Sequence, residues 1–252
     1  MLRNIALLLQ YKGSAYHGWQ RQQNALTVQE TLEAVAKKVC GLTGTITGCG
    51  RTDAGVHALF YVCNFFSKTK IPDEKIAFAL NYSLPDDICV LGAATVDMHF
   101  HARYSVVKKR YQYKILNTPH GDVFQKDLAW HCRTPLDLER MRFGAQAILG
   151  EHDFRAFCAS GAQTKDFVRT VYSLDITKQD GIVTIDVCGN GFLYNMVRII
   201  AGTLVYVGTG RIEPEAVGAV IASCDRRRAG ITAPPHGLYM ARVYYEPEIE
   251  WK

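Results

Sequence analysis

One short segment gathers several side chains that could do chemistry. It is Gly48-Cys49-Gly50-Arg51-Thr52-Asp53-Ala54-Gly55-Val56-His57-Ala58. Its three glycines permit tight backbone turns and the close approach of a ligand. Asp53, next to a cationic side chain in a glycine-bounded loop, could act as a nucleophile or as a base. The alternative is a polar turn in which this aspartate only hydrogen-bonds backbone amides.

Several common reaction types lack their motifs in this sequence. No G-x-G-x-x-G follows an expected strand, because Asp53 stands where the third glycine would be. The Walker lysine motif, H-E-x-x-H and G-x-S-x-G are also absent from the sequence. Nucleotide-dependent, zinc-peptidase and α/β-hydrolase functions are therefore poorly supported.

The composition is that of an ordinary globular protein of 252 residues. Hydrophobic residues make up 48% and charged residues 21%, which excludes wholesale disorder. The 29 Lys and Arg against 24 Asp and Glu give a net charge of +5, a mild excess that is compatible with a polyanionic partner. The eight cysteines form no C-x-x-C pair, so we expect neither a disulfide framework nor a metal site.

The longest apolar stretch, Met196 to Val207, contains Arg198 and is too short to span a bilayer. The N-terminal apolar run is predicted to be a strand rather than a leader. We expect a cytoplasmic protein.

Hydrophobic periodicity places these residues on alternating helices and strands. Thr27 and Glu30 fit a capping box ahead of an amphipathic helix that Gly41 ends, and a Gly- and Thr-rich turn is expected after it. The other predicted helices are 73–82, 136–149, 192–207 and 213–222. The predicted strands are 5–10, 57–66, 88–94, 105–117, 168–177, 181–188 and 239–245.

This order of elements predicts an α+β protein. The turn Lys178-Gln179-Asp180-Gly181 joins two strands as a hairpin, which favours antiparallel pairing. We expect two α/β-sandwich-like domains, residues 1–105 with the Asp53 loop and residues 106–252 with the apolar helix that carries Arg198. Their mainly antiparallel sheets are expected to join into one continuous sheet.

The Asp53 loop, as G-R-T-D-A-G-V-H-A, resembles the signature of the tRNA pseudouridine synthase A family. The resemblance extends from about Asn4 to Tyr245, in family order, and departs from the family pattern only slightly, as at Cys49 and at Tyr194-Asn195. The further matching segments are Y-H-G-W-Q-R-Q from Tyr16, T-V-Q-E from Thr27, L-P-D-D-I from Leu84, F-H-A-R from Phe100, K-R-Y-Q-Y from Lys109, G-E-H-D-F from Gly150, F-L-Y-N-M-V-R from Phe192, T-A-P from Thr232 and G-L-Y from Gly237.

The resemblance implies the pseudouridine synthase fold and isomerisation of uridine to pseudouridine in tRNA. The N1–C1′ bond breaks and the base rejoins through C5, a reaction that needs no cofactor. Asp53 would be the catalytic carboxylate, which either attacks the sugar or removes its 2′ proton; both routes remain open.

The resemblance also implies roles for three more residues. Arg198 would pair with Asp53, Tyr111 would stack on the uracil, and Arg51 would engage the RNA or displace the target base from its stack. The alternatives are a cation snorkelling from an apolar helix, a tyrosine packed on its sheet and a surface ion pair, respectively. The histidines of the matching segments, His57, His101 and His152, are expected to fix loops by hydrogen bonds.

The family implies a tRNA partner, bound as a homodimer, with uridines 38, 39 and 40 of the anticodon stem-loop as targets. Candidate phosphate contacts are Lys108 to Arg110 and Arg226 to Arg228, although such short runs are usually solvated. A nucleoside hydrolase is one alternative, but it would usually need a second acid, and none lies beside Asp53 in the loop. An RNA-binding module without catalysis is the other.

Overall fold

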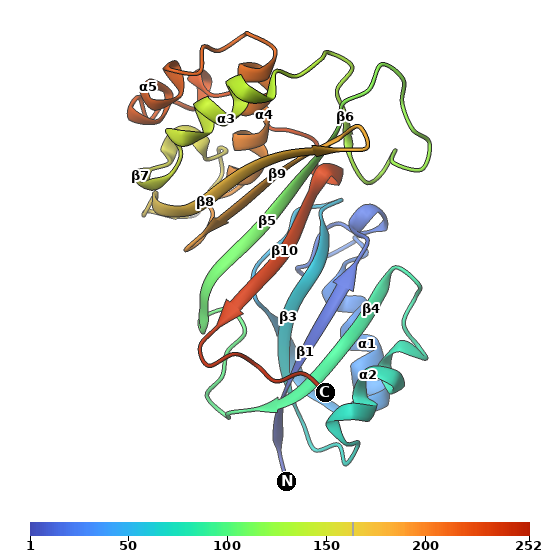
Figure 1. The fold of residues 1–252 in the computed structure, drawn as a ribbon. Helices are drawn as coiled ribbons and strands as arrows, with labels where there is room; N and C mark the ends of the chain where they lie inside the picture. Colours follow the sequence, from blue (N-terminus) through green and yellow to red (C-terminus); the bar gives the residue numbers. More distant parts are fainter. Residues whose placement is uncertain (163) are drawn as a thin grey trace. The chain divides into compact units, whose positions relative to one another are not determined.

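The computed structural model describes residues 1–162 and 164–252. The chain divides into unit 1, which comprises Met1–Val107 and Tyr239–Lys252, and unit 2, which comprises Lys108–Leu238. Both units are α+β with mainly antiparallel sheets (Figure 1), as the sequence predicts.

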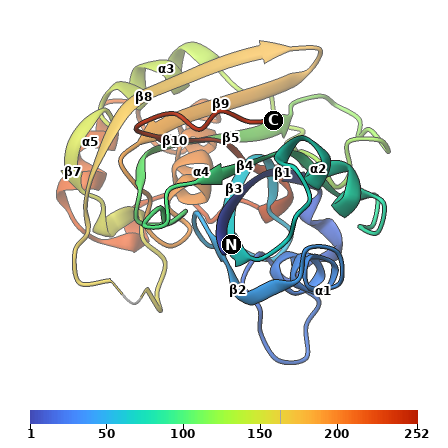
Figure 2. The same cartoon turned by 90° about the horizontal axis from the view of Figure 1, so that it is seen from below.

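Unit 1 is built on strand β1 (Arg3–Tyr11), which pairs antiparallel with β3 (His57–Ser67) on one side and β4 (Ile88–Val96) on the other. The free side of β3 takes β2 (Leu42–Gly48), antiparallel, near one end and β10 (Leu238–Tyr245), parallel, near the other. Helix α1 (Val28–Cys40) packs on β2, α2 (Asp73–Asn81) packs on β4, and the two helices contact each other (Figure 2).

Local signals explain where α1 begins and ends. The side chain of Thr27 accepts a hydrogen bond from the Glu30 amide, and Gly41 takes the left-handed conformation (φ 61°) that closes many helices. Leu32 and Ala36 are fully buried against the sheet. This helix therefore matches the prediction at both ends.

In unit 2 the sheet order is β5-β9-β8-β7, with β6 (Trp130–His131) parallel to β5. The strands are β5 (Val106–Leu116), β7 (Gly150–Asp153), β8 (Val168–Gln179) and β9 (Ile182–Gly189). Helix α3 (Leu138–Gln146) packs on β8 and contacts both α4 (Met196–Gly208) and α5 (Ala216–Ala222). Short 3-10 turns lie at residues 13–15, 155–157, 226–228 and 235–237.

The structure differs from the sequence predictions in several places, and the short strands β6 and β7 are among the elements that were not expected. Residues 42–48 form strand β2, where a turn is expected. The sequence does not reveal this strand because Ile46 is the one deeply buried residue of the segment, so the hydrophobic pattern is weak. The predicted helices over 136–149, 192–207 and 213–222 all begin later than expected. Residues 239–252, which were expected in the second domain, group with residues 1–107, since β10 pairs with β3.

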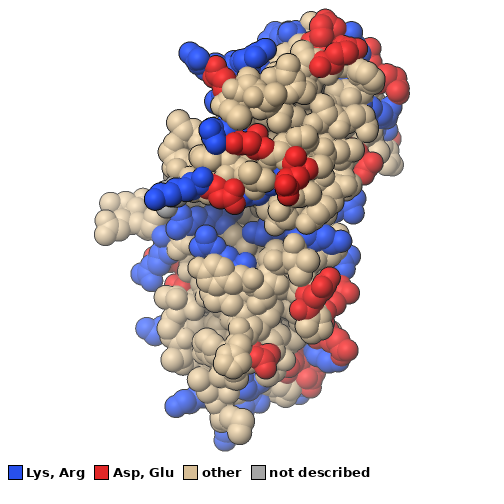
Figure 3. All heavy atoms as spheres, turned by 90° about the vertical axis from the view of Figure 1, so that its left-hand side faces the viewer, with Lys and Arg blue, Asp and Glu red and all other residues tan. Residues whose placement is uncertain are grey.

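None of the helices in the described part of the chain combines the length and hydrophobicity that crossing a lipid bilayer requires. The face drawn in Figure 3 carries Lys and Arg as well as Asp and Glu side chains.

Candidate active site

The Asp53 loop connects β2 to β3 in unit 1. Thr52 is buried, Arg51 is exposed, and Asp53 is partly exposed. The loop therefore presents the carboxylate and the guanidinium at the surface while the residue between them anchors it.

Buried aromatic side chains fix the first half of the Asp53 loop. The Tyr61 hydroxyl donates to the Gly50 carbonyl at 2.5 Å, and the Tyr11 hydroxyl lies 2.9 Å from Thr52 Oγ1. Trp19 stacks on Tyr61 with ring centroids 4.2 Å apart. All three aromatic residues are almost completely buried, so the first half of the loop rests on a rigid apolar platform.

The chain that follows β1 clamps the loop through its backbone. The Trp19 amide donates to the Thr52 carbonyl at 3.2 Å, and the Gly55 amide donates to the Tyr16 carbonyl at 3.1 Å. Gly18 lies so close that a Cβ there would stand 2.2 Å from the Thr52 carbonyl oxygen, and its φ of +83° also disfavours a side chain. The G-W pair of the N-terminal motif thus shapes the Asp53 loop.

The histidines of the motifs hydrogen-bond local backbone, as predicted. His57 Nδ1 accepts from the Gly13 amide at 3.0 Å, and its ring stacks on Tyr239, whose pKa burial raises to about 12. His101 Nδ1 accepts from the amides of the second and third residues after it, and His152 Nε2 lies 2.8 Å from a backbone carbonyl oxygen. These rings support loops and strand ends.

Tyr111 lies on β5 in unit 2. Its ring meets Phe192 edge-on, with centroids 5.2 Å apart and an interplanar angle of 85°, and 9% of the residue is exposed. Two residues along the strand, the hydroxyl of fully buried Tyr113 donates to the Pro234 carbonyl at 2.7 Å. Burial raises the pKa of this second phenol well above its usual range. Tyr111 is therefore held on a rigid strand.

Arg198 projects from the first turn of α4. Asn195, in the left-handed conformation (φ 59°), precedes the helix and accepts a hydrogen bond from Arg198 Nη1 at 2.8 Å. Arg198 Nε donates to the Ala233 carbonyl at 2.7 Å, and the Ala233 amide donates back to the Arg198 carbonyl at 3.1 Å. The guanidinium is thus oriented by the segment that precedes β10, not left to snorkel freely.

The structure places Asp53 and Arg51 in unit 1, and Tyr111 and Arg198 in unit 2. Within unit 2, Phe192 links the Tyr111 ring to the start of α4, and Pro234 and Ala233 link Tyr113 to Arg198. Each pair of predicted residues therefore shares one locally ordered region.

Sequence reasoning missed several supporting groups. Tyr11, Tyr61 and Asn195 had no assigned role, although all three lie within or beside the quoted motifs or predicted strands. His236, in the 3-10 turn after Pro234, was also missed. Burial lowers its pKa, Asp127 and a hydrogen bond to the Ala129 backbone oppose that shift, and Arg198 adds to it.

Neither pair contains a set of metal ligands. Among the residues that the structure describes, no three His, Cys, Asp or Glu side chains gather closely enough to hold a metal ion.

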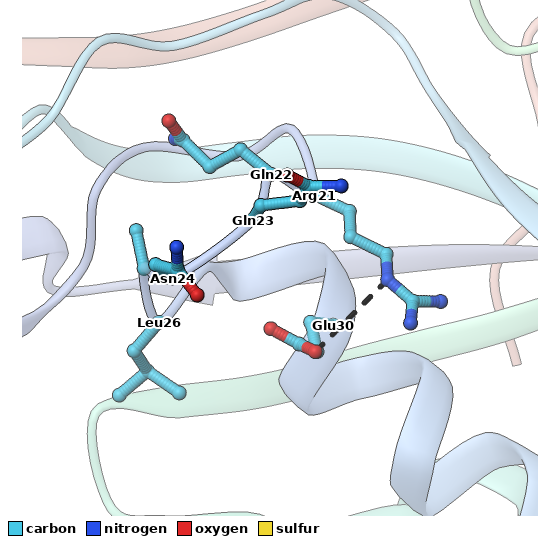
Figure 4. A pocket seen from close by; sticks show the side chains of 7 residues that line it. Arg21, Gln22, Gln23, Asn24, Leu26 and Glu30 are labelled. Atoms are coloured by element: carbon cyan, nitrogen blue, oxygen red, sulfur yellow. Dashed lines mark ion pairs between the residues drawn. The ribbon is translucent and has the colours of Figure 1, made fainter.

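An open hollow of about 890 Å³ lies in unit 1 at the tip of the hairpin formed by residues 21–26 (Figure 4). Residues 21–26 and Glu30 line it, and Arg21 and Glu30 face each other across it with an N–O distance of 4.0 Å. Asp53 is not among the lining residues. The hollow is open and is lined by polar and apolar side chains alike, so we assign it no part in the chemistry of Asp53.

Comparison with known proteins identifies the family. A family model described as tRNA pseudouridine synthase matches residues 8–105 and 145–246, which include Asp53 and Arg198 but not Tyr111. Proteins named tRNA pseudouridine synthase A are similar over their whole length. Those of Thermoanaerobacter sp. (strain X514), at 50% identity, and Ruminiclostridium cellulolyticum, at 46%, each align with 97% of this chain and 100% of their own.

A protein of the same name from Syntrophotalea carbinolica is 45% identical over 97% of each chain. A solved structure titled "Crystal Structure of a Cbf5-Nop10-Gar1 Complex" is distantly similar, with 14% identity and a TM-score of 0.37 over 93% of this chain and 57% of that chain. Given the match of the family model and of these full-length relatives, the chain belongs to the tRNA pseudouridine synthase family, whose members are isomerases.

Proposed function

We propose that this protein isomerises uridine to pseudouridine in tRNA, at positions 38, 39 and 40 of the anticodon stem-loop, with Asp53 as the catalytic carboxylate. The observation that carries the proposal is the loop itself. Its backbone is fixed at Gly50, Thr52 and Gly55, while Asp53 stays partly exposed within a full-length match to the family.

The chemistry divides among the four site residues. Asp53 assists cleavage of the N1–C1′ bond, by attack on the sugar or by removal of its 2′ proton. The Arg198 guanidinium, oriented by Asn195 and Ala233, pairs with that carboxylate. Tyr111 supplies a flat surface on which the severed uracil can rotate. C5 of the uracil then bonds to C1′, and C5 loses its proton afterwards.

Arg51, exposed two residues before Asp53, contacts the RNA and favours extrusion of the target base. Extrusion from a stem costs a few kcal/mol, which phosphate contacts must offset. We further propose that the protein acts in the cytoplasm as a homodimer that holds one tRNA across both subunits.

Replacement of Asp53 tests the assignment. We expect Asp53→Asn to lower the release of tritium from C5-labelled uridine in a tRNA transcript by more than about 10³-fold. Binding of the tRNA should change less than threefold, because the substitution removes no phosphate contact. Asp86→Asn, at an exposed carboxylate of unit 1, is the control.

Normal release by Asp53→Asn would refute the catalytic role. Chromatography of the products separates the remaining alternatives. A nucleoside hydrolase would liberate free uracil, an RNA-binding module would leave uridine intact, and the isomerase retains the base as pseudouridine.

A further inference from the structure

We infer that Gln29, together with Glu33, is a positioning residue for the Asp53 loop. Both side chains lie on α1, four residues apart, and both are buried, at 6% and 8% exposure. The inference rests on the proposed function, since it assigns these two residues to the support of the proposed catalytic aspartate.

The side chains of Gln29 and Glu33 hydrogen-bond backbone groups of β2 at a point where its pairing with β3 is interrupted. The pairing of β2 with β3 shifts register between Thr43 and Thr47, so Ile46 lies where the ladder is interrupted. Gln29 Nε2 donates to the Ile46 carbonyl at 2.9 Å, and Glu33 Oε1 accepts from the Ile46 amide at 2.9 Å. The helix thereby fixes β2 just before it leads into residues 49–56.

Gln29 also hydrogen-bonds Trp19 and Arg21, in the segment that clamps the Asp53 loop. Its backbone amide donates to the Trp19 carbonyl at 3.0 Å, and its Oε1 accepts from the Arg21 amide at 2.9 Å. Trp19 in turn donates to the Thr52 carbonyl. One glutamine therefore connects the segment that clamps the loop with the strand that enters it.

Glu33 orients this glutamine. Its Oε1 accepts a hydrogen bond from Gln29 Nε2 at 3.1 Å, while its Oε2 lies 3.7 Å from Arg21 Nη1. With the contacts to Ile46 and Arg21, both protons of the Gln29 amide and its oxygen are engaged. A fully satisfied buried network of this kind specifies one geometry, and loss of one member releases the others.

Gln29→Met keeps the length of the side chain and removes its hydrogen bonds. We expect the single-turnover rate of pseudouridine formation at saturating enzyme to fall 10- to 100-fold, because small displacements of a catalytic group are costly. The Kd for the tRNA transcript should stay within threefold. Hydrogen exchange of the amides in residues 49–57 should accelerate about tenfold.

A reciprocal pair of substitutions provides a partial rescue. Gln29→Glu alone sets two carboxylates against each other and should impair the enzyme as Gln29→Met does. Adding Glu33→Gln restores the hydrogen bond between the two side chains and the acceptors for the Arg21 and Ile46 amides, but it leaves the Ile46 carbonyl without its donor, so we expect a rate above that of Gln29→Glu and below that of the wild type.

Asn81→Leu is the matched control. Asn81 clamps Val90 in the same manner, with two hydrogen bonds of 2.8 Å from α2 to a register shift in β4, but β1 separates β4 from β3. It should lower thermal stability without slowing single turnover.

Three results would overturn the inference: an unchanged rate in Gln29→Met, an equal slowing in Asn81→Leu, or the absence of recovery in the double variant. Activity of Asp53→Asn would refute the proposed function separately, since the exchange measurement reports on Gln29 whether or not Asp53 is catalytic.

Discussion

The phenol of Tyr111 offers the proposed reaction both a ring and a hydroxyl. The ring is held edge-on by Phe192 on a strand paired with β9, so it can present one face to a planar base without moving. The hydroxyl is the one group of this side chain that can accept or donate a proton, so it is the candidate for moving the C5 proton. The two contributions can be separated because phenylalanine retains the ring.

We expect Tyr111→Phe to leave the Kd for tRNA within threefold and to slow the release of C5 tritium about 10²-fold, the usual scale of a lost acid–base group. Tyr111→Ala should also weaken binding of the stem-loop, since the stacking surface is removed.

Tyr194→Phe, at an exposed tyrosine of the same unit, controls for loss of a hydroxyl as such. Unchanged release by Tyr111→Phe would limit the role of Tyr111 to stacking.

At this scale the sequence identifies candidate functional side chains but not the groups that support them. Asp53 and Arg198 are marked by local motifs, and the structure shows each on an ordered loop or helix end. The supports come from distant parts of the chain: Tyr11 from β1, Tyr61 from β3 and Ala233 from the segment before β10. No pattern within a short window encodes such contacts.

At the scale of elements, helix α4 and the segment that follows α5 pack against each other around Arg198. A Cβ on Gly202 would stand 1.9 Å from the Ile231 carbonyl oxygen, so the segment lies directly on the helix. Thr203, fully buried on α4, accepts a hydrogen bond from the Gly230 amide at 2.8 Å. This contact fixes the residues that lead to Ala233 and so to the guanidinium.

Thr203→Val should therefore destabilise the protein by about 1–3 kcal/mol, the cost of leaving a buried amide without its acceptor. We also expect a five- to tenfold loss of turnover, because the segment that orients Arg198 loosens. Urea denaturation and single-turnover assays measure the two effects.

Thr209→Val is the comparison, since the Thr209 hydroxyl acts as a donor to the helix carbonyls of Val205 and Tyr206. Equal effects of both substitutions would show that the contact between Thr203 and Gly230 has no special weight.

The elements themselves were predictable wherever periodicity and punctuation agreed. The α1 cap and Gly41 mark its ends, and the hairpin turn places left-handed Asp180 and Gly181 between β8 and β9. Helix α4 begins at Met196 rather than at residue 192, because left-handed Asn195 interrupts the helical path. The apolar composition from Phe192 onward conceals this break.

At the scale of the whole molecule, the last strand belongs with the first part of the chain. Tyr239 and Met240 pair in parallel with His57 and Ala58, directly after the Asp53 loop. A linear division of the chain at residue 105 could not anticipate this return, since the pairing joins residues that are far apart in sequence. The long-range partner of a strand is the least local property of a fold.

The three arginines of the Arg226 to Arg228 cluster differ in how far their charge is already engaged by the protein. Within the Arg226 to Arg228 cluster, Arg226 is committed to the protein, because it donates to the Gly230 carbonyl and to Thr232 Oγ1. Arg227 forks onto Asp225 and lowers the pKa of that carboxyl to about 2. Arg228 is exposed at the end of the same 3-10 turn.

These differences predict which arginine contributes to binding of the polyanion. Each phosphate contact adds about 0.7–0.9 to the dependence of log Kd on log salt concentration, so Arg228→Ala should reduce that slope by about 1 and weaken binding of all tRNAs alike. Arg227→Ala should change the slope less, because its charge is already compensated by Asp225. Titrations of labelled tRNA between about 50 and 200 mM salt measure both. Equal slopes for wild type and Arg228→Ala would place the RNA elsewhere and leave the segment at Lys108 to Arg110 as the remaining basic cluster to examine.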